Sequence, residues 1–242
     1  MNHRLSEKDN SVPPLVRLSD TGRLETFSDG VFSVTITLLL YEVARPEYQA
    51  GHLLDRLLTQ WPTYIAFLAS FLYVGVIWLN HRAVYGRVRY CDIKLHWANL
   101  ILLLTSALIP FPTAVFSRAF LEGDNFDAQV AVALYAIIGG VMCLSWLVLF
   151  HVLYIHPYLL EHGVEPRFFH GERIRAIIGI CAYAIAGVAG WALSPLLAVF
   201  IFLLLPIFYG VTSEGLTEGP RLRVRLLRER KRERRGEADE NS

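Results

Sequence analysis

Six long apolar segments divide this chain, and they restrict its fold more than any other feature of the sequence. A helix needs about 20 mostly apolar residues to cross the hydrocarbon core of a bilayer. The apolar segments run near residues 24–44, 61–81, 93–116, 128–155, 174–193 and 196–213. Because lipid offers no water to backbone amides and carbonyls, each segment must satisfy its own hydrogen bonds as a helix. The sequence therefore predicts an all-α integral membrane protein with six transmembrane helices.

Composition and pattern support this class. The chain is 54% apolar with a mean hydropathy of +0.38, above the roughly 45–50% apolar content of a soluble domain. The apolar segments do not alternate between apolar and polar residues, as the strands of a transmembrane β-barrel do in runs of about 10 residues. We therefore expect a multi-pass protein of the cell membrane.

The positions of lysine and arginine predict the orientation of the chain. Of its 23 lysines and arginines, only Arg45, Arg56 and Arg118 lie in the connections that would face outward. The other twenty flank the opposite ends of the spans, and basic residues are enriched on the cytoplasmic side. We expect both termini in the cytoplasm, with a polar N-terminal segment at 1–22, a six-span domain at 23–213 and a basic tail at 214–242. The tail either contacts anionic lipid or is a solvated helical extension that fixes the topology; nucleic-acid binding is not expected.

The first apolar segment carries a stripe of apolar residues at helical spacing. Steps of four, three, four and three separate the members of the stripe, which are Phe27, Val31, Val34, Leu38 and Tyr41. This spacing places them on one helix face, and Thr37 lies beside it. Such a face can pack against copies of itself around an axis. It can also face lipid or other helices of the same chain, and the spacing leaves both interpretations open.

The same segment begins with polar residues that need partners. A charge on a spanning helix costs roughly 2.5–3.5 kcal/mol on insertion scales and normally faces a partner in the protein interior. Candidate partners stand at the end of the second segment and the start of the third. The predicted buried network contains Arg23, Ser28, Asp29, Trp78, His81 and Asn99. It would hold three helices together; the alternative is that Asp29 and His81 relay protons or cations.

Residues 23–29, RLETFSD, resemble the RxxxFSD signature of the transmembrane protein 175 family, a group of cation channels. FLYVGVIWLNHR at 71–82 resembles the second helix of that family, and WANLILLLTSALIPFPTAV at 97–115 resembles the third. Phe27 belongs to the signature, so we group it with the polar network. The resemblance covers roughly residues 23–118, while the later spans match only in number and orientation.

The resemblance implies a potassium-permeable homotetramer in which the first helices line a central pore. The pore and its constriction would be formed by Val34, Leu38 and Tyr41, with Thr37 beside Val34; Tyr41 would either occlude the outer mouth or lie in the interfacial aromatic belt. No TVGYG-type filter loop is present in the sequence. No cofactor and no fixed metal are implied, only potassium ions passing Thr37. Val34 is smaller than the isoleucine or leucine usual in the family, and Gly30 stands where alanine is usual.

Two other classes of function, a transporter and an intramembrane enzyme, are the alternatives to a channel. A secondary cation or proton transporter would show internal repeats and helices broken by glycine or proline, whereas Pro110 and Pro112 are expected at the end of the third span. An intramembrane enzyme would need catalytic motifs such as a nucleophile elbow or HExxH, which are absent from the sequence. HPYLLEH at 156–162 does not have the spacing of a helical metal site and is expected to be a cytoplasmic surface loop. We therefore expect no enzymatic activity.

Overall fold

Helices form nearly all of the secondary structure in this computed structural model, which describes residues 18–41, 43, 49–165 and 167–212. The elements in chain order are β1 (Ser19–Asp20), α1 (Gly22–Tyr41), α2 (Leu53–Thr59), α3 (Trp61–Tyr85), β2 (Tyr90–Cys91), α4 (Ile93–Ala107), α5 (Pro110–Glu122), α6 (Asn125–Ile155), the 3₁₀ helix η1 (Pro157–Leu159), α7 (Arg167–Ala192) and α8 (Pro195–Thr212). The predicted all-α class is confirmed.

Five of the predicted spans coincide with helices that are long and apolar enough to cross a membrane. They are Trp61–Tyr85, Ile93–Glu122, Asn125–Ile155, Arg167–Ala192 and Pro195–Thr212. Helix α1 is 20 residues long and covers most of the first predicted span, but its acidic and hydroxyl residues lower its hydropathy, and it is not one of the five. A sixth span therefore stays a prediction. The polar segment before residue 18, the tail after residue 212 and the end of the first span lie outside the described residues.

The third span differs from its prediction. The sequence predicts an end near residue 116 with the prolines at that end, whereas α4 ends at Ala107 and α5 continues the same span from Pro110 to Glu122. Proline has no amide hydrogen and fits the first turn of a helix, so Pro110 begins a new helix within the span. The prolines thus lie inside the span, and their predicted position no longer argues against a transporter.

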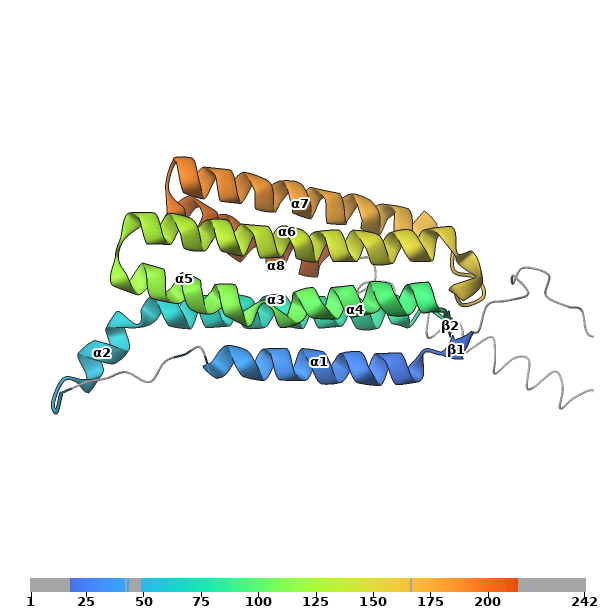
Figure 1. The fold of residues 1–242 in the computed structure, drawn as a ribbon, viewed down its shortest axis with the longest axis horizontal. Coiled ribbons are helices and arrows are strands. Elements are labelled where there is room, and N and C mark those ends of the chain that lie inside the picture. Colours follow the sequence, from blue (N-terminus) through green and yellow to red (C-terminus); the bar gives the residue numbers. More distant parts are fainter. Residues whose placement is uncertain (1–17, 42, 44–48, 166, 213–242) are drawn as a thin grey trace, which may run out of the picture.

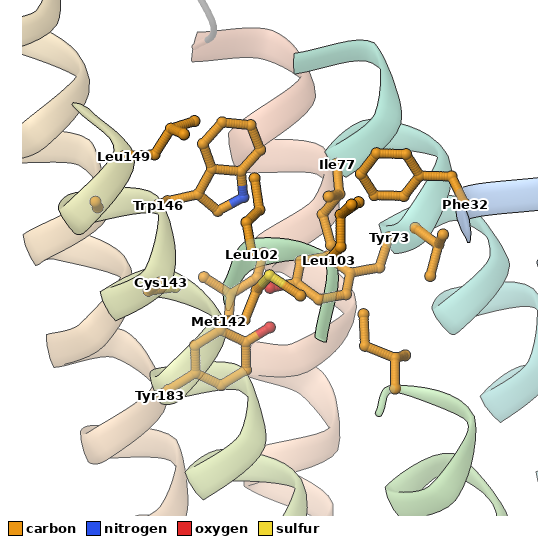
Figure 2. Close-up of a cluster of buried hydrophobic side chains, with 14 of the residues drawn as sticks. Phe32, Tyr73, Ile77, Leu102, Leu103, Met142, Cys143, Trp146, Leu149 and Tyr183 are labelled. Carbon is orange, nitrogen blue, oxygen red and sulfur yellow. The ribbon is translucent and has the colours of Figure 1, made fainter. Parts of the chain in front are cut away.

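The helices lie side by side in a bundle, with α1 along one edge and α6, α7 and α8 on the other side (Figure 1). Small residues let α6 and α7 approach closely. A Cβ atom on Gly190 would lie 2.5 Å from Cγ1 of Val132, and one on Gly139 would lie 2.3 Å from the Tyr183 ring. Large side chains fill the space between the helices: Figure 2 shows Phe32, Ile77, Met142 and Tyr183 among those that point into this core.

One end of the bundle is tied together by short backbone pairings. Strand β1, just before α1, pairs with β2, so that Ser19 faces Cys91 and Asp20 faces Tyr90. The chain around β2 also pairs with the connection between α6 and α7, through an antiparallel bridge between Val88 and Leu160. Because β1 leads directly into Gly22, these pairings fix the start of α1 relative to the rest of the bundle (Figure 1).

The first helix as candidate functional site

Helix α1 has one buried face and one exposed face. Its buried residues are Leu24, Ser28, Phe32, Thr35 and Leu39, which recur every three or four positions and pack against α3 and α4. Four members of the predicted stripe lie on the other face, while Val31 is half-buried against the core. Val34 is 57% exposed, Leu38 44% and Tyr41 83%, and Thr37 is exposed as well. The described helices of the chain therefore leave all four predicted pore residues uncovered.

Thr37 carries the one aliphatic hydroxyl group in the predicted set of pore residues. Its Oγ1 donates to the backbone oxygen of Val34 at 2.8 Å. A hydroxyl has one hydrogen and two acceptor lone pairs, so this bond uses the hydrogen and leaves the oxygen as an acceptor on the exposed face. An oxygen in this state can contact a partly dehydrated cation.

The buried face of α1 carries a chain of hydrogen bonds to α3 and α4. Asn99 Nδ2 donates to Ser28 Oγ at 2.9 Å, and Asn99 Oδ1 lies 2.8 Å from Nε2 of His81. Ser28 Oγ in turn donates to the backbone oxygen of Leu24 at 2.8 Å. Because an amide oxygen only accepts, His81 must donate from Nε2 in this arrangement. All three side chains are at most 1% exposed.

Aromatic rings hold His81 in this orientation. Tyr85 stacks on its imidazole with centroids 4.4 Å apart, and Phe32 packs edge-on at 5.2 Å. Phe32 comes from α1 and Tyr85 from the last turn of α3. The rings and the hydrogen bonds together join α1, α3 and α4 at one level of the bundle.

Three residues assigned to this network lie elsewhere. Arg23 and Phe27 are exposed on the same face as Val34, and Arg23 forms no hydrogen bond or ion pair with any other described residue. Asp29 is also exposed, and its Oδ1 accepts from Nε1 of Trp78 at 2.8 Å. Consecutive residues on a helix point about 100° apart, so Ser28 and Asp29 cannot face the same partners. The predicted network is therefore divided into a buried chain and a separate pair nearer the surface.

Replacing Asp29 by asparagine should destabilise the protein by about 1 kcal/mol, because a neutral amide oxygen accepts the Trp78 hydrogen more weakly than a carboxylate. Ion selectivity should not change, since Asp29 is off the stripe. Thermal unfolding of purified protein and the yield of the assembled oligomer measure the first effect. Trp78→Phe should have a similar effect, and the double variant should add little because both residues share one bond. Normal yield with a lost pH or ion dependence would rule out a bracing role for Asp29.

Sequence reasoning missed polar groups deeper in the bundle. Glu172 and Arg175 form an ion pair on α7, and Arg175 also donates to the backbone oxygen of Tyr209 and to Oγ1 of Thr212 near the end of α8. Their spacing of three residues on a helix was an available signal. The bonds that join Arg175 to α8 could not be read from the sequence, because they depend on how α7 and α8 pack.

Comparison with known proteins finds similarity to potassium channels of one family. The model of the family described as the endosomal/lysosomal potassium channel TMEM175 matches residues 23–110. A potassium channel of Streptomyces collinus is 33% identical over 194 residues, which are 80% of this chain and 93% of that protein. A potassium channel of Chamaesiphon minutus is 30% identical over 208 residues, which are 81% of this chain and 97% of that protein.

A solved structure is also similar to the whole bundle. It is the crystal structure of a homologue, from Chamaesiphon minutus, of the lysosomal potassium-selective channel TMEM175. It matches with a TM-score of 0.67 and 30% identity, covering 80% of this chain and 98% of that one. Family model, relatives and structure agree, and the chain belongs to the TMEM175 family.

Proposed function

We propose that this protein is a potassium-permeable cation channel of the cell membrane, formed by four copies of the chain around a pore lined by α1. The observation that carries the proposal is the exposed face of α1, on which Val34, Thr37, Leu38 and Tyr41 lie together. Its relatives in Streptomyces collinus and Chamaesiphon minutus are potassium channels. The proposed topology has α1 as a sixth span and both termini in the cytoplasm.

Conduction in this proposal depends on apolar rings and not on a carbonyl filter. Four Val34 side chains and four Leu38 side chains would surround the axis, and a narrow apolar ring opposes the passage of hydrated ions by dewetting. Four Thr37 hydroxyls between these rings would offer acceptor oxygens to an ion that has lost part of its water. Tyr41 would stand at the outer mouth. Selectivity for potassium over sodium then comes from the lower cost of dehydrating potassium, and it is modest.

The buried chain of Ser28, His81 and Asn99 supports the pore helix from behind. These groups join α1 to α3 and α4 on the buried face of α1. Buried hydrogen bonds fix one geometry, since any displacement leaves polar groups without partners in a low-dielectric interior. We include in the proposal that these hydrogen bonds hold α1 in place. The basic tail at 214–242 is proposed to lie on anionic lipid or to fix the topology.

A secondary cation or proton transporter is the alternative. The proline break between α4 and α5 is the observation in its favour, since broken helices occur at transporter binding sites. The break, however, lies in the span formed by α4 and α5, whereas the exposed hydroxyl of Thr37 is on the unbroken helix α1. A channel explains the uncovered face of α1 without a further substrate site.

Purified protein in planar bilayers tests the proposal. We expect unitary currents that reverse at potentials set by the potassium gradient, smaller sodium currents, and no current from a large organic cation such as N-methyl-D-glucamine. Coupled flux without resolvable unitary currents would instead identify a transporter. A folded oligomer that passes neither ion would contradict the channel proposal.

A further inference from the structure

Arg89 in the α3–α4 connection and Lys94 in the first turn of α4 donate hydrogen bonds to two histidines in the α6–α7 connection. Arg89 Nη1 lies 2.7 Å from Nδ1 of His162, and Lys94 Nζ lies 3.2 Å from Nε2 of His156. Both histidines belong to the HPYLLEH motif. An arginine or lysine usually pairs with a carboxylate, so two pairs with imidazole at one contact between segments are unusual.

These pairs require neutral histidines. His156 Nδ1 lies 2.9 Å from the backbone oxygen of Val152. A carbonyl oxygen only accepts, so the proton of the neutral ring is on Nδ1 and Nε2 accepts from Lys94. For His162, the guanidinium group of Arg89 only donates, so Nδ1 is the acceptor. Protonation would place an N–H and a positive charge against the cation in each pair, and both hydrogen bonds would be lost.

Within the described part of the chain, few other charged groups interact with these histidines. From η1, the Tyr158 ring packs edge-on against His156 at 5.6 Å, and its hydroxyl donates to Oδ2 of Asp92 at 3.0 Å. Burial and the bond to Asp92 raise the pKa of Tyr158 to about 12, so Tyr158 stays neutral between pH 5 and 8. Among the described residues, no carboxylate forms an ion pair with His156 or His162, including those of Glu161 and Glu165 in the same connection.

The contact between the two connections is linked to the start of α1 through backbone hydrogen bonds. Its backbone part consists of Arg89 N donating to Leu159 O at 2.8 Å and Glu161 N donating to Arg87 O at 2.9 Å. These bonds hold the chain that forms β2, and β2 pairs with β1, the strand from which α1 begins. Figure 1 shows β1, β2 and the α6–α7 connection at the same end of the bundle.

We propose that His156 and His162 form a proton-binding site that regulates the channel. The two connections face the cytoplasm in the proposed topology. Acidification of the cytoplasm protonates this site and reduces the conductance of the channel. Imidazole changes charge between pH 5 and 8. Protonation releases Arg89 and Lys94, weakens the hold on β2 and β1, and frees the start of α1. The exposed apolar residues of α1 then pack more closely about the axis, since burying apolar surface is favourable, and the narrower pore dewets. This direction of the effect rests on the proposed channel function.

A double substitution separates titration from hydrogen bonding. In His156→Gln the amide oxygen can take the place of Nε2, and in His162→Asn the amide oxygen can take the place of Nδ1, so both basic side chains keep an acceptor that does not titrate. The control is the double variant His151→Gln/His170→Asn, which replaces two exposed histidines outside the contact. Conductance in planar bilayers is measured with the cytoplasmic side at pH 7.5 and at pH 5.5.

Wild type and the control should lose most of their conductance, by about fivefold or more, at pH 5.5, while His156→Gln/His162→Asn should keep it. Hydrogen exchange in lipid nanodiscs, corrected for the intrinsic effect of pH, should show protection of the Arg89 and Glu161 amides falling on acidification in wild type but not in the double variant. Conductance that ignores cytoplasmic pH, or a pH effect that survives in the double variant, would overturn the proposal while leaving the channel function intact. If neither wild type nor either double variant conducts, the channel proposal fails. Unchanged amide protection in wild type on acidification would overturn the proton-binding site, whatever the conductance shows.

Discussion

Val34→Asn should increase the potassium conductance about tenfold and bring the ratio of potassium to sodium permeability closer to one. Val34 is exposed on the stripe, and four valines around an axis would form an apolar ring that water and ions enter at a cost. An amide in place of each isopropyl group offers hydrogen bonds to water and removes this cost. A barrier lowered by about 1.4 kcal/mol corresponds to a tenfold rate. Sodium, which is harder to dehydrate, gains more than potassium when the pore is wetter.

Two matched variants make this measurement specific. Leu40 is also exposed on α1, at 62%, but the helical rotation of 100° per residue places it about 120° from Val34. Leu40→Asn should therefore leave conductance and selectivity close to those of wild type. Val34→Ile adds one methylene to the ring and should decrease conductance. If Val34→Asn has no effect in a conducting protein, or Leu40→Asn has the larger effect, the pore axis lies along another face of the helix.

Asn99→Leu should lower the free energy of unfolding by about 2–4 kcal/mol. The leucine removes both the acceptor for His81 and the donor to Ser28, and both groups are buried at no more than 1% exposure. A buried polar group without a partner costs about 1–3 kcal/mol, and Ser28 keeps its bond to the Leu24 carbonyl, so the orphaned His81 nitrogen dominates the loss. Thermal unfolding of the purified protein measures the effect.

Ser106→Ala is the control for Asn99→Leu. Ser106 is on the same helix and fully buried, but its Oγ donates to the backbone oxygen of Leu102 one turn earlier. Removing this hydroxyl leaves that carbonyl with its helical hydrogen bond, so the loss should stay below about 1 kcal/mol. Equal destabilisation by the two variants would show that the hydrogen bonds joining Ser28, Asn99 and His81 have no special role in holding α1.

The fold class was readable from the sequence because membrane spans are set by length and hydropathy alone. The long apolar segments match the observed helices α3, α4–α5, α6, α7 and α8, since a backbone in lipid has no alternative to the helix. The exposed stripe of α1 was readable as well, because helical periodicity decides which residues share a face whatever the helix packs against. The choice between lipid, the same protomer and other copies depends on neighbours that the sequence does not specify.

Tertiary structure decided which polar residues meet. Ser28 and Asp29 are adjacent in one motif, yet packing buries the first against Asn99 and leaves the second near the surface with Trp78. Pro110 was visible in the sequence, but only the position of α5 shows that the span continues past it. The pairs of Arg89 with His162 and of Lys94 with His156 join residues 73 and 62 positions apart. The sequence by itself determined the helices and their faces, because these follow from local periodicity and burial in lipid. Contacts between distant segments follow from how the helices pack, and only the three-dimensional structure contains that information.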